Sequence, residues 1–284
     1  MLKPSRLYSF LDSKNGIALH FLDGQKLIND LALIHPLAGP GFAFFRDMVL
    51  SFMPLISFLK AGENLGIYID SEEPYFRLKI ETSYVGQTRT LLLPEQFSEF
   101  PINLTGAARV TKQFPHGRSA YTSVVNFHDT PSKEVVNNIL KTSYQANAEI
   151  VLSEMADQSV LVIKLPAVNV NSTLDDETES LATFLKGHKS FFHNIFDENH
   201  NDVESVVRAF EDSNFAYLSS KQVDLFCPCS KDRMVGNLKL MFLQDPEALF
   251  AGKETLEAKC DYCKKTYEIS RSDLSSPFSN GPIN

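Results

Sequence analysis

Four cysteines near the C-terminus are the residues of this sequence best suited to chemistry. A Cys-Pro-Cys motif at 227–229 is followed after thirty residues by Cys-Asp-Tyr-Cys at 260–263, and the chain has four cysteines in all. Two close pairs separated by a spacer suit a tetrahedral site, because each pair supplies two thiolates about 2.3 Å from the metal. The spacing predicts one Zn²⁺ per chain, bound by Cys227, Cys229, Cys260 and Cys263.

The first pair is tighter than the two Cys-x-x-Cys knuckles of an ordinary zinc ribbon. One interpretation is a structural zinc site with one tight knuckle. The other is a metal site built to be oxidised, because zinc keeps its cysteine ligands as the thiolates that oxidants attack. Disulfides Cys227–Cys229 and Cys260–Cys263 would then expel the metal, and the first would be strained and easily reduced. The spacing leaves both interpretations open.

Length, composition and charge limit the size, the binding partners and the cellular location of this protein. The chain has 284 residues, 43% of them hydrophobic, which is enough for a core domain and a small module. A formal net charge of −8 argues against nucleic acid and anionic membranes as partners. The most apolar stretch, 42–59, contains Arg46, Asp47 and Pro54, so we expect no membrane span. The N-terminus lacks the features of a signal peptide, which predicts a cytoplasmic location, where clustered cysteines bind metal or do redox chemistry.

Residues 1–170 are predicted to form an α+β core domain with a mixed or antiparallel sheet. Short β-branched and alternating segments predict strands at 17–22, 64–70, 75–82, 89–93, 107–111, 121–128, 148–153 and 160–165. Helices are expected at 25–34, at 42–60 with a kink at Pro54, and after Thr130, which would cap a helix that begins at Pro131. The 22 phenylalanines indicate either a Phe-packed core or rings that become exposed to bind apolar partners.

Residues 171–225 are predicted to be a helical linker. The segment has eleven acidic and four basic residues, so we expect it to be stable only when its apolar stripes are buried on a surface. One helix is expected at 176–186, with Gly187 as its C-cap. In a second helix the residues expected to dock have i, i+3, i+4, i+7 spacing: Val203, Val206, Val207 and Phe210.

Residues 226–275 are predicted to be a zinc-binding module and residues 276–284 a flexible tail. Ser230 is expected to cap a helix over 231–241 that buries one face. The residues of that face are Met234, Val235, Leu238, Met241 and Phe242. Segments 256–258 and 266–269 are expected to pair as strands around the second cysteine pair. A module of this size has too small a core to be secure alone, so metal binding would decide whether it folds.

At these residues the sequence resembles the redox-regulated 33 kDa chaperonin (heat shock protein 33) family. The resemblance rests on CPCSKDRM, on CDYCKKTYEIS with a helix start at 271–274, and on the spacer between the pairs. Weaker similarity runs through SRLYSFL, GAARVTKQFP at 106–115 and RSAYTSVVNFHDTPSKEVVNNILKTSYQANAEIVL. The Phe-rich first sixty residues and segment 64–105 depart from the family pattern.

The resemblance implies an ATP-independent holdase that is folded and inactive when reduced and zinc-bound. Peroxide or hypochlorous stress with heat would form the disulfides Cys227–Cys229 and Cys260–Cys263 and release zinc. The module and the linker at 171–225 would then unfold, and a homodimer would bind unfolded client proteins. The resemblance implies no enzymatic activity.

Other functions fit the sequence less well. The main alternative is a constitutive zinc-ribbon adaptor, but residues 227–274 carry eight basic and eight acidic residues, which argues against nucleic acid. A thiol–disulfide oxidoreductase would place its second pair at a helix start, whereas KKTYEIS reads as a strand. His188, His193 and His200 lack ligand spacing and are expected at the surface, as is the acidic group at 175–179. No Ser–His–Asp or Cys–His arrangement is evident.

Overall fold

The computed structural model describes residues 2–115, 119–166, 180–197 and 202–275. The chain forms two compact units, Met1–Leu225 and Phe226–Asn284. The first contains a large mixed sheet with helices, and the second a hairpin with helices, so the α+β class expected from the sequence is confirmed. The predicted boundary near residue 170, the acidic group at 175–179 and the tail at 276–284 lie outside the described residues.

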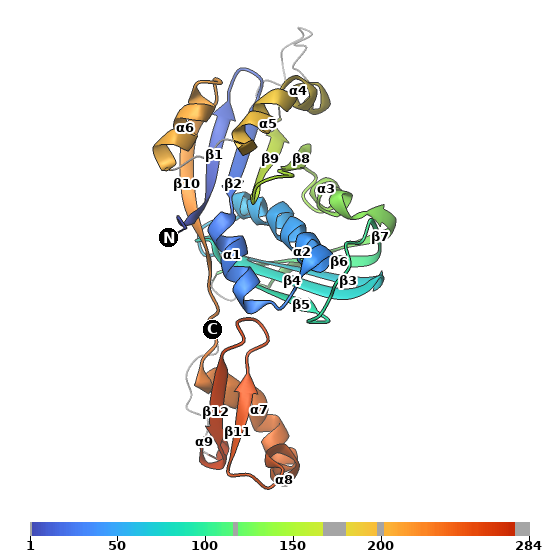
Figure 1. Ribbon diagram of the computed structural model, residues 1–284, viewed down its shortest axis with the longest axis vertical. Coiled ribbons are helices and arrows are strands. Elements are labelled where there is room, and N and C mark those ends of the chain that lie inside the picture. Colours follow the sequence, from blue (N-terminus) through green and yellow to red (C-terminus); the bar gives the residue numbers. More distant parts are fainter. Residues whose placement is uncertain (1, 116–118, 167–179, 198–201, 276–284) are drawn as a thin grey trace. The chain divides into compact units, whose positions relative to one another are not determined.

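Ten strands in the described part of the first unit form one sheet, in the order β7-β6-β3-β4-β5-β10-β1-β2-β9-β8 (Figure 1). They are β1 (Ser5–Asp12), β2 (Ile17–Asp23), β3 (Asn64–Glu73), β4 (Tyr75–Ser83), β5 (Gln87–Leu93), β6 (Asn103–Gln113), β7 (Tyr121–Pro131), β8 (Ala148–Leu152), β9 (Gln158–Lys164) and β10 (Ala216–Leu225). The sequence predicted eight of them and missed β1 and β10.

Strand β10 corrects the expectation that the linker is helical throughout 171–225. It pairs antiparallel with β1 and, through Asp224 and Leu225, parallel with β5. At this end the backbones approach closely over Gly86, where φ is +87° and an added Cβ would lie 2.0 Å from the carbonyl oxygen of Gln222. Strand β10 joins the two halves of the sheet, and its last residue directly precedes the cysteine unit.

One face of the sheet is covered by helices, and Figure 1 shows α1 and α2 lying across it. The elements are α1 (Gln25–Ile34), α2 (Gly39–Phe52), the 3₁₀ helices η1 (Met53–Phe58) and η2 (Ser132–Glu134), and α3 (Val135–Thr142). With the strands they form a cluster of 34 buried apolar residues. This cluster is the main core of the unit.

The long helix expected at 42–60 ends earlier than predicted. The α-helix stops at Phe52 and continues as the 3₁₀ helix η1, because Pro54 has no amide hydrogen to donate and its ring crowds the preceding turn. Among the described helices, Gly39–Phe58 is the segment long and apolar enough to cross a membrane, and 67% of its apolar 18-residue window is buried inside the protein. Such burial is typical of a core helix.

The predicted helix start at Thr130 and Pro131 is wrong. Strand β7 continues to Pro131, which still pairs with Asn103 of β6, and α3 begins only at Val135. Pairing between the strands therefore overrides the local capping pattern. The helix nevertheless buries one apolar face, formed by Val135, Val136, Ile139 and Leu140.

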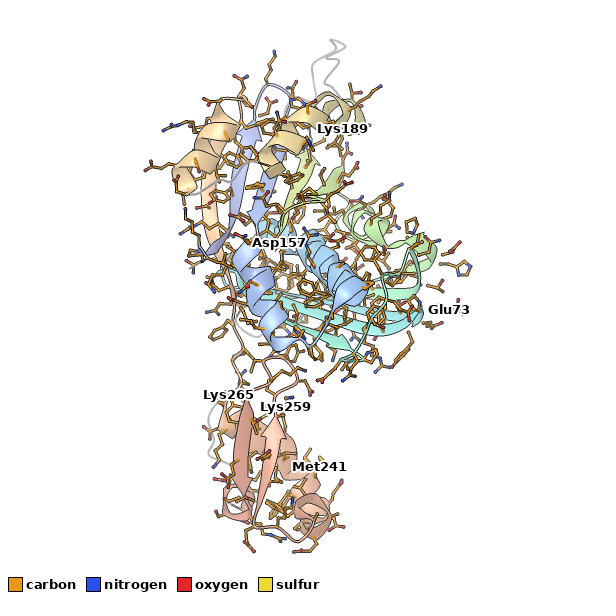
Figure 2. The ribbon with its side chains drawn as sticks, viewed as in Figure 1. Glu73, Asp157, Lys189, Met241, Lys259 and Lys265 are labelled. Atoms are coloured by element: carbon orange, nitrogen blue, oxygen red, sulfur yellow. The ribbon has the colours of Figure 1, made fainter. Side chains whose placement is uncertain are left out.

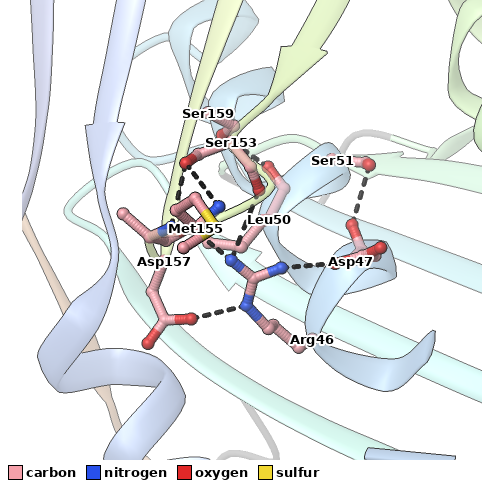
Figure 3. A network of polar contacts seen from close by, with 9 residues as sticks. Arg46, Asp47, Leu50, Ser51, Ser153, Met155, Asp157 and Ser159 are labelled. Carbon is pink, nitrogen blue, oxygen red and sulfur yellow. Dashed lines mark hydrogen bonds and ion pairs between the residues drawn. The ribbon is translucent and has the colours of Figure 1, made fainter. Parts of the chain in front are cut away.

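A polar network fixes the turn between β8 and β9 to α2 (Figure 3). The Nε of Arg46 lies 2.6 Å from Asp157 Oδ1, and a second guanidinium nitrogen lies 2.6 Å from Asp47 Oδ1. The third donates to the carbonyl oxygens of Ser153 and Ala156. One arginine thus ties the hairpin to the helix that covers the main core.

The opposite face of β1, β2 and β9 is covered by α4 (Leu181–Gly187), α5 (Lys189–Asp197) and α6 (Val203–Glu211), as Figure 1 shows. Here 15 buried residues form a second core, which we call the phenylalanine cluster: Tyr8, Phe10, Ile17, Leu19, Phe21, Val160, Val162, Leu181, Phe184, Phe192, Ile195, Phe196, Val206, Phe210 and Phe215. Phe210 stacks on Phe10 with ring centroids 4.0 Å apart. Aromatic packing therefore attaches the helices of the linker to the sheet.

The four residues of α6 that were predicted to dock differ in how deeply they are buried. Val206 and Phe210 are buried in the phenylalanine cluster, Val203 packs partly against it, and Val207 is half-buried. Gly187 is the last residue of α4, not its C-cap, which is His188.

The second unit contains α7 (Lys231–Gln244), α8 (Pro246–Phe250), β11 (Thr255–Lys259), β12 (Thr266–Ser270) and α9 (Arg271–Ser275). As predicted, Ser230 caps α7 by accepting a hydrogen bond from the Arg233 amide. The predicted apolar face is correct except at Met241, which is 55% exposed. In the described part, three buried apolar residues form its core cluster, Phe250, Ile269 and Leu274, and Cys260 and Tyr267 are also buried.

Candidate metal centre

The four cysteine sulfurs, far apart in the sequence, lie together in the second unit. Each Sγ is within 4.8 Å of the other three, and all four thiols are free. Cys227 and Cys229 come from the segment that leads into α7, and Cys260 and Cys263 from the turn between β11 and β12. Cys260 is buried and the others are half-buried. The cluster therefore combines two cysteines from each of two separate segments. We call residues 227–229 the first cysteine turn and residues 260–263 the second cysteine turn.

The second turn is held by its own backbone. The amide of Cys260 donates to the Lys265 carbonyl at 2.9 Å, and the amide of Lys264 donates to the Cys260 carbonyl at 2.9 Å. Lys264 has a φ of +62°, which closes the turn in the left-handed region. The two sulfurs are thereby directed to one side.

The spacing of the sulfurs fits a tetrahedral metal. With metal–sulfur bonds of about 2.3 Å, the sulfurs of a tetrahedron lie about 3.8 Å apart. The separation is 3.7 Å between Cys227 and Cys260 and 3.3 Å between Cys229 and Cys263. A small inward or outward movement of the thiols would complete the coordination. These four residues can hold one metal ion.

Hydrogen bonds make the four thiols unequal. Burial raises the pKa of Cys227 to about 12, although the Cys229 amide donates to its sulfur. Burial also raises the pKa of Cys263. At Cys229 burial acts in the same direction, but hydrogen bonds from Tyr267 and the other thiols outweigh it and lower its pKa to about 7. These hydrogen bonds therefore favour the thiolate form of Cys229 over that of Cys227.

Basic side chains surround the second turn. Lys259 and Lys265 stand at the two strand ends next to it, where Figure 2 labels them, and Lys264 lies within it. Four thiolates around a divalent ion carry a formal charge of −2, which these ammonium groups would offset. A bound divalent cation would be the main charge that keeps all four sulfurs ionised.

The structure places the other candidate residues elsewhere. His188 stacks on Phe184 with centroids 4.0 Å apart, and its Nδ1 lies 2.9 Å from the Phe184 carbonyl oxygen. His193 is exposed, and His200 lies outside the described residues. Because a strand follows Cys263, the second pair lacks the helix start at which thiol oxidoreductases place their cysteines.

Sequence reasoning missed one member of the site, Tyr267. Its hydroxyl lies 3.1 Å from Cys229 Sγ. Strand alternation from the buried Ile269 would have placed Tyr267 on the inner face of the hairpin, but nothing in the sequence indicates which sulfur it meets.

Comparison with known proteins decides the family. The family model described as "Hsp33 protein" matches residues 5–270. This chain belongs to the Hsp33 family. Among curated relatives, the 33 kDa chaperonin of Synechococcus elongatus is 23% identical over 256 residues, covering 84% of each chain. That of Aquifex aeolicus is 21% identical over 277 residues, covering 91% of this chain and 85% of the relative.

A solved structure has the same fold as this Hsp33 chain. The 33 kDa chaperonin of Thermotoga maritima matches with a TM-score of 0.71 and 12% sequence identity, covering 95% of this chain and 96% of the other. The Hsp33 family and the names of its members identify a chaperone, a class of protein that acts by binding other proteins.

Proposed function

We propose that this chain is a redox-regulated, ATP-independent holdase that binds unfolding proteins under oxidative and heat stress. The observation that carries the proposal is the cluster of four free thiols, two from each turn, in a unit with almost no apolar core. The reduced, metal-bound form is the inactive state. Oxidation of the cysteines releases the metal and exposes apolar surface to clients.

The proposed metal is Zn²⁺, one per chain. A tetrahedral set of four thiolates is a closed site typical of structural zinc. Zinc supplies binding free energy of roughly 10–16 kcal/mol in small peptides, which this unit needs in order to fold. Cys227, Cys229, Cys260 and Cys263 would hold the ion, and each would do so as a thiolate.

The proposed activation step joins the sulfurs in two disulfides, Cys227–Cys229 and Cys260–Cys263. The four thiolates lose four electrons to two molecules of hydrogen peroxide, which take up four protons and leave as four molecules of water. Sulfurs in disulfides are no longer metal ligands, so the divalent ion departs. The step consumes only the oxidant and protons.

The proposed consequence is loosening of the linker, residues 171–225. Strand β10 of this segment ends two residues before Cys227, and the helices of the segment are attached through the phenylalanine cluster. Release would expose rings such as Phe210 and Phe10, which are fully buried in the reduced form. Large aromatic faces suit the apolar segments of unfolding clients.

We further propose that the active form is a cytoplasmic homodimer with four functional segments. These are a core domain at 1–170, the linker at 171–225, a sensor module at 226–275 and a tail at 276–284.

One preparation tests the proposal. Zinc release and suppression of citrate synthase aggregation are measured without ATP, before and after peroxide at heat-shock temperature. We expect both to rise together and to reverse with a thiol reductant. A variant with all four cysteines replaced by serine is the control and should not respond to peroxide. If oxidation brings no gain in holding activity, the holdase proposal is rejected.

Disulfide mapping by mass spectrometry tests the pairing. All four sulfurs lie within 4.8 Å of one another, so bonds between the turns are also within reach. Bonds within each turn would support the proposed step. Bonds between Cys227 and Cys260 or between Cys229 and Cys263 would replace it with a crosslinked, still compact unit.

A constitutive zinc adaptor is the second candidate. The observation that favours it is the exposed apolar strip on α7, where Leu240, Met241 and Leu243 are 70%, 55% and 66% exposed. Such a strip suits a protein partner. Retention of zinc after peroxide treatment would favour the adaptor over the holdase.

A further inference from the structure

Tyr267 links the two cysteine turns through its hydroxyl group. The residue lies on β12, which follows the second turn, but its Oη lies 3.1 Å from the Sγ of Cys229 in the first. The same oxygen donates to the carbonyl oxygen of Cys229 at 3.0 Å. A single hydroxyl therefore faces two acceptors of one residue, 38 positions away in the chain.

The position of this hydroxyl is fixed by the fold of the hairpin. Tyr267 pairs with Ala258 of β11 and shares the inner face of β12 with Ile269, which is fully buried. Its ring is 9% exposed, and the Nζ of Lys265 lies 5.2 Å from the ring centroid. The side chain is held by packing and is not free to swing away from the sulfur.

The contact differs from the hydrogen bonds to the neighbouring sulfurs. Cys227 and Cys263 accept hydrogen bonds from backbone amides, those of Cys229 and Lys265. The sulfur of Cys229 instead contacts the side-chain hydroxyl of Tyr267, so this contact can be removed by substitution. A hydroxyl has one proton, and a metal-bound thiolate is a stronger acceptor than a neutral carbonyl.

We propose that Tyr267 is a positioning residue that holds Cys229 as a metal ligand and slows its oxidation. Donation from the hydroxyl draws electron density from the thiolate and makes it a weaker nucleophile toward peroxide. Once Cys229 is in a disulfide, its sulfur no longer carries a negative charge. The hydroxyl of Tyr267 then donates its hydrogen bond to the carbonyl oxygen of Cys229. This inference rests on the proposed function, because it assigns the residue that sets the threshold of the switch.

The test replaces Tyr267 by phenylalanine, which keeps the ring and removes the hydroxyl. Zinc release by peroxide is followed with a colorimetric chelator, and we expect it to be about tenfold faster, the size of effect that loss of an outer-shell contact has. In protein loaded with Co²⁺, the sulfur-to-metal charge-transfer band should move to longer wavelength. A fluorotyrosine at this position, a stronger donor in the same packing, should move both quantities in the opposite direction.

Controls separate this inference from the proposed function. Tyr75→Phe, on an exposed tyrosine of the first unit, should leave both quantities unchanged. If the unmodified protein releases no zinc on oxidation, the proposed function fails. If it does, but Tyr267→Phe leaves the release rate and the cobalt band unchanged, only the role of Tyr267 is overturned. The role is also overturned if zinc loss to a chelator without peroxide accelerates equally and the band does not move, because the tyrosine then acts through packing alone.

Discussion

The two units of this chain are held together by different means. The first buries 34 apolar residues in its main core and 15 in the phenylalanine cluster. In the part that the structure describes, the second has a cluster of only three, buries Cys260 and Tyr267 as well, and gathers four free thiols. Burial of a large side chain contributes roughly 1.5–3 kcal/mol, so three of them cannot offset the chain entropy of about fifty residues.

The difference shows where a redox signal can act. An oxidant cannot change the apolar core of the first unit, but it can oxidise the four free thiols that the second unit brings together. The phenylalanine cluster should be intermediate in its response to an oxidant. It is apolar like the main core, but part of it is built from the linker. Four predictions test this contrast, beginning with the largest expected effect.

Removing the metal should have the largest effect, because it should unfold the second unit and leave the first folded. We expect a strong chelator to unfold residues 226–275 while β3 to β7 stay protected, because roughly 10–16 kcal/mol of metal binding is lost only in the second unit. Hydrogen exchange read by mass spectrometry, unit by unit, is the measurement. Retained protection in both units would show that the second has an adequate core of its own.

Weakening the phenylalanine cluster should lower the threshold for activation. We expect Phe210→Ser to destabilise the first unit by at least about 3 kcal/mol, since it removes a fully buried ring and leaves a cavity. Val206→Ser should act in the same direction with a smaller effect. Urea unfolding and the peroxide concentration needed for holding activity are the two measurements.

The matched control for these variants is Leu218→Ser, because Leu218 is 56% exposed on β10. It should change neither the stability nor the threshold. If Phe210→Ser destabilised the unit but left the peroxide threshold unchanged, the cluster would not be part of the switch.

The first unit should lose stability in mild acid through His20. Burial, with a smaller effect of Lys221, lowers the pKa of His20 to about 4 from its usual 6.5. The unfolded chain binds a proton at His20 near pH 6.5, whereas the folded chain binds it only near pH 4. The contribution of His20 to the free energy of unfolding is therefore complete above pH 6.5 and is lost as the pH falls from 6.5 to about 4. Because the ring is partly exposed, we expect about 2 kcal/mol.

Comparing His20→Gln with the parent chain isolates this contribution from that of the carboxylates. The free energy of unfolding, measured from pH 7 to pH 4, should fall less steeply in the variant. Parallel curves would mean that the hydrogen bond between His20 and Ser9 keeps the protonated ring as stable as the neutral one.

The smallest effect should come from the cap of α7. Ser230→Ala removes a hydrogen bond to the Arg233 amide, at a cost of about 1 kcal/mol. Because folding of the second unit is coupled to metal binding, we expect zinc affinity to fall about fivefold. Ser180→Ala removes the corresponding cap of α4 in the first unit, and zinc affinity should not change. Equal losses in both variants would argue against separate sources of stability.

Local patterns in the sequence predicted many of the helices and strands. The cap at Ser230, the β11–β12 hairpin and eight strands of the sheet follow from alternation and capping. The errors concern strand pairing that local patterns do not show: the missed strands β1 and β10 pair with each other across most of the unit, and β7 extends past Thr130 because β6 pairs with it. Local propensity is too weak to resist such pairing.

By itself, the sequence determined the candidate metal ligands, because two closely spaced cysteine pairs in a chain with no others leave little choice of chemistry. It also determined that the linker must be supported by a surface. Only the tertiary structure decided which surface that is, that the linker ends as a strand in the sheet, and that Tyr267 meets Cys229. Those outcomes depend on contacts between residues far apart in the chain, which periodicity and spacing do not record.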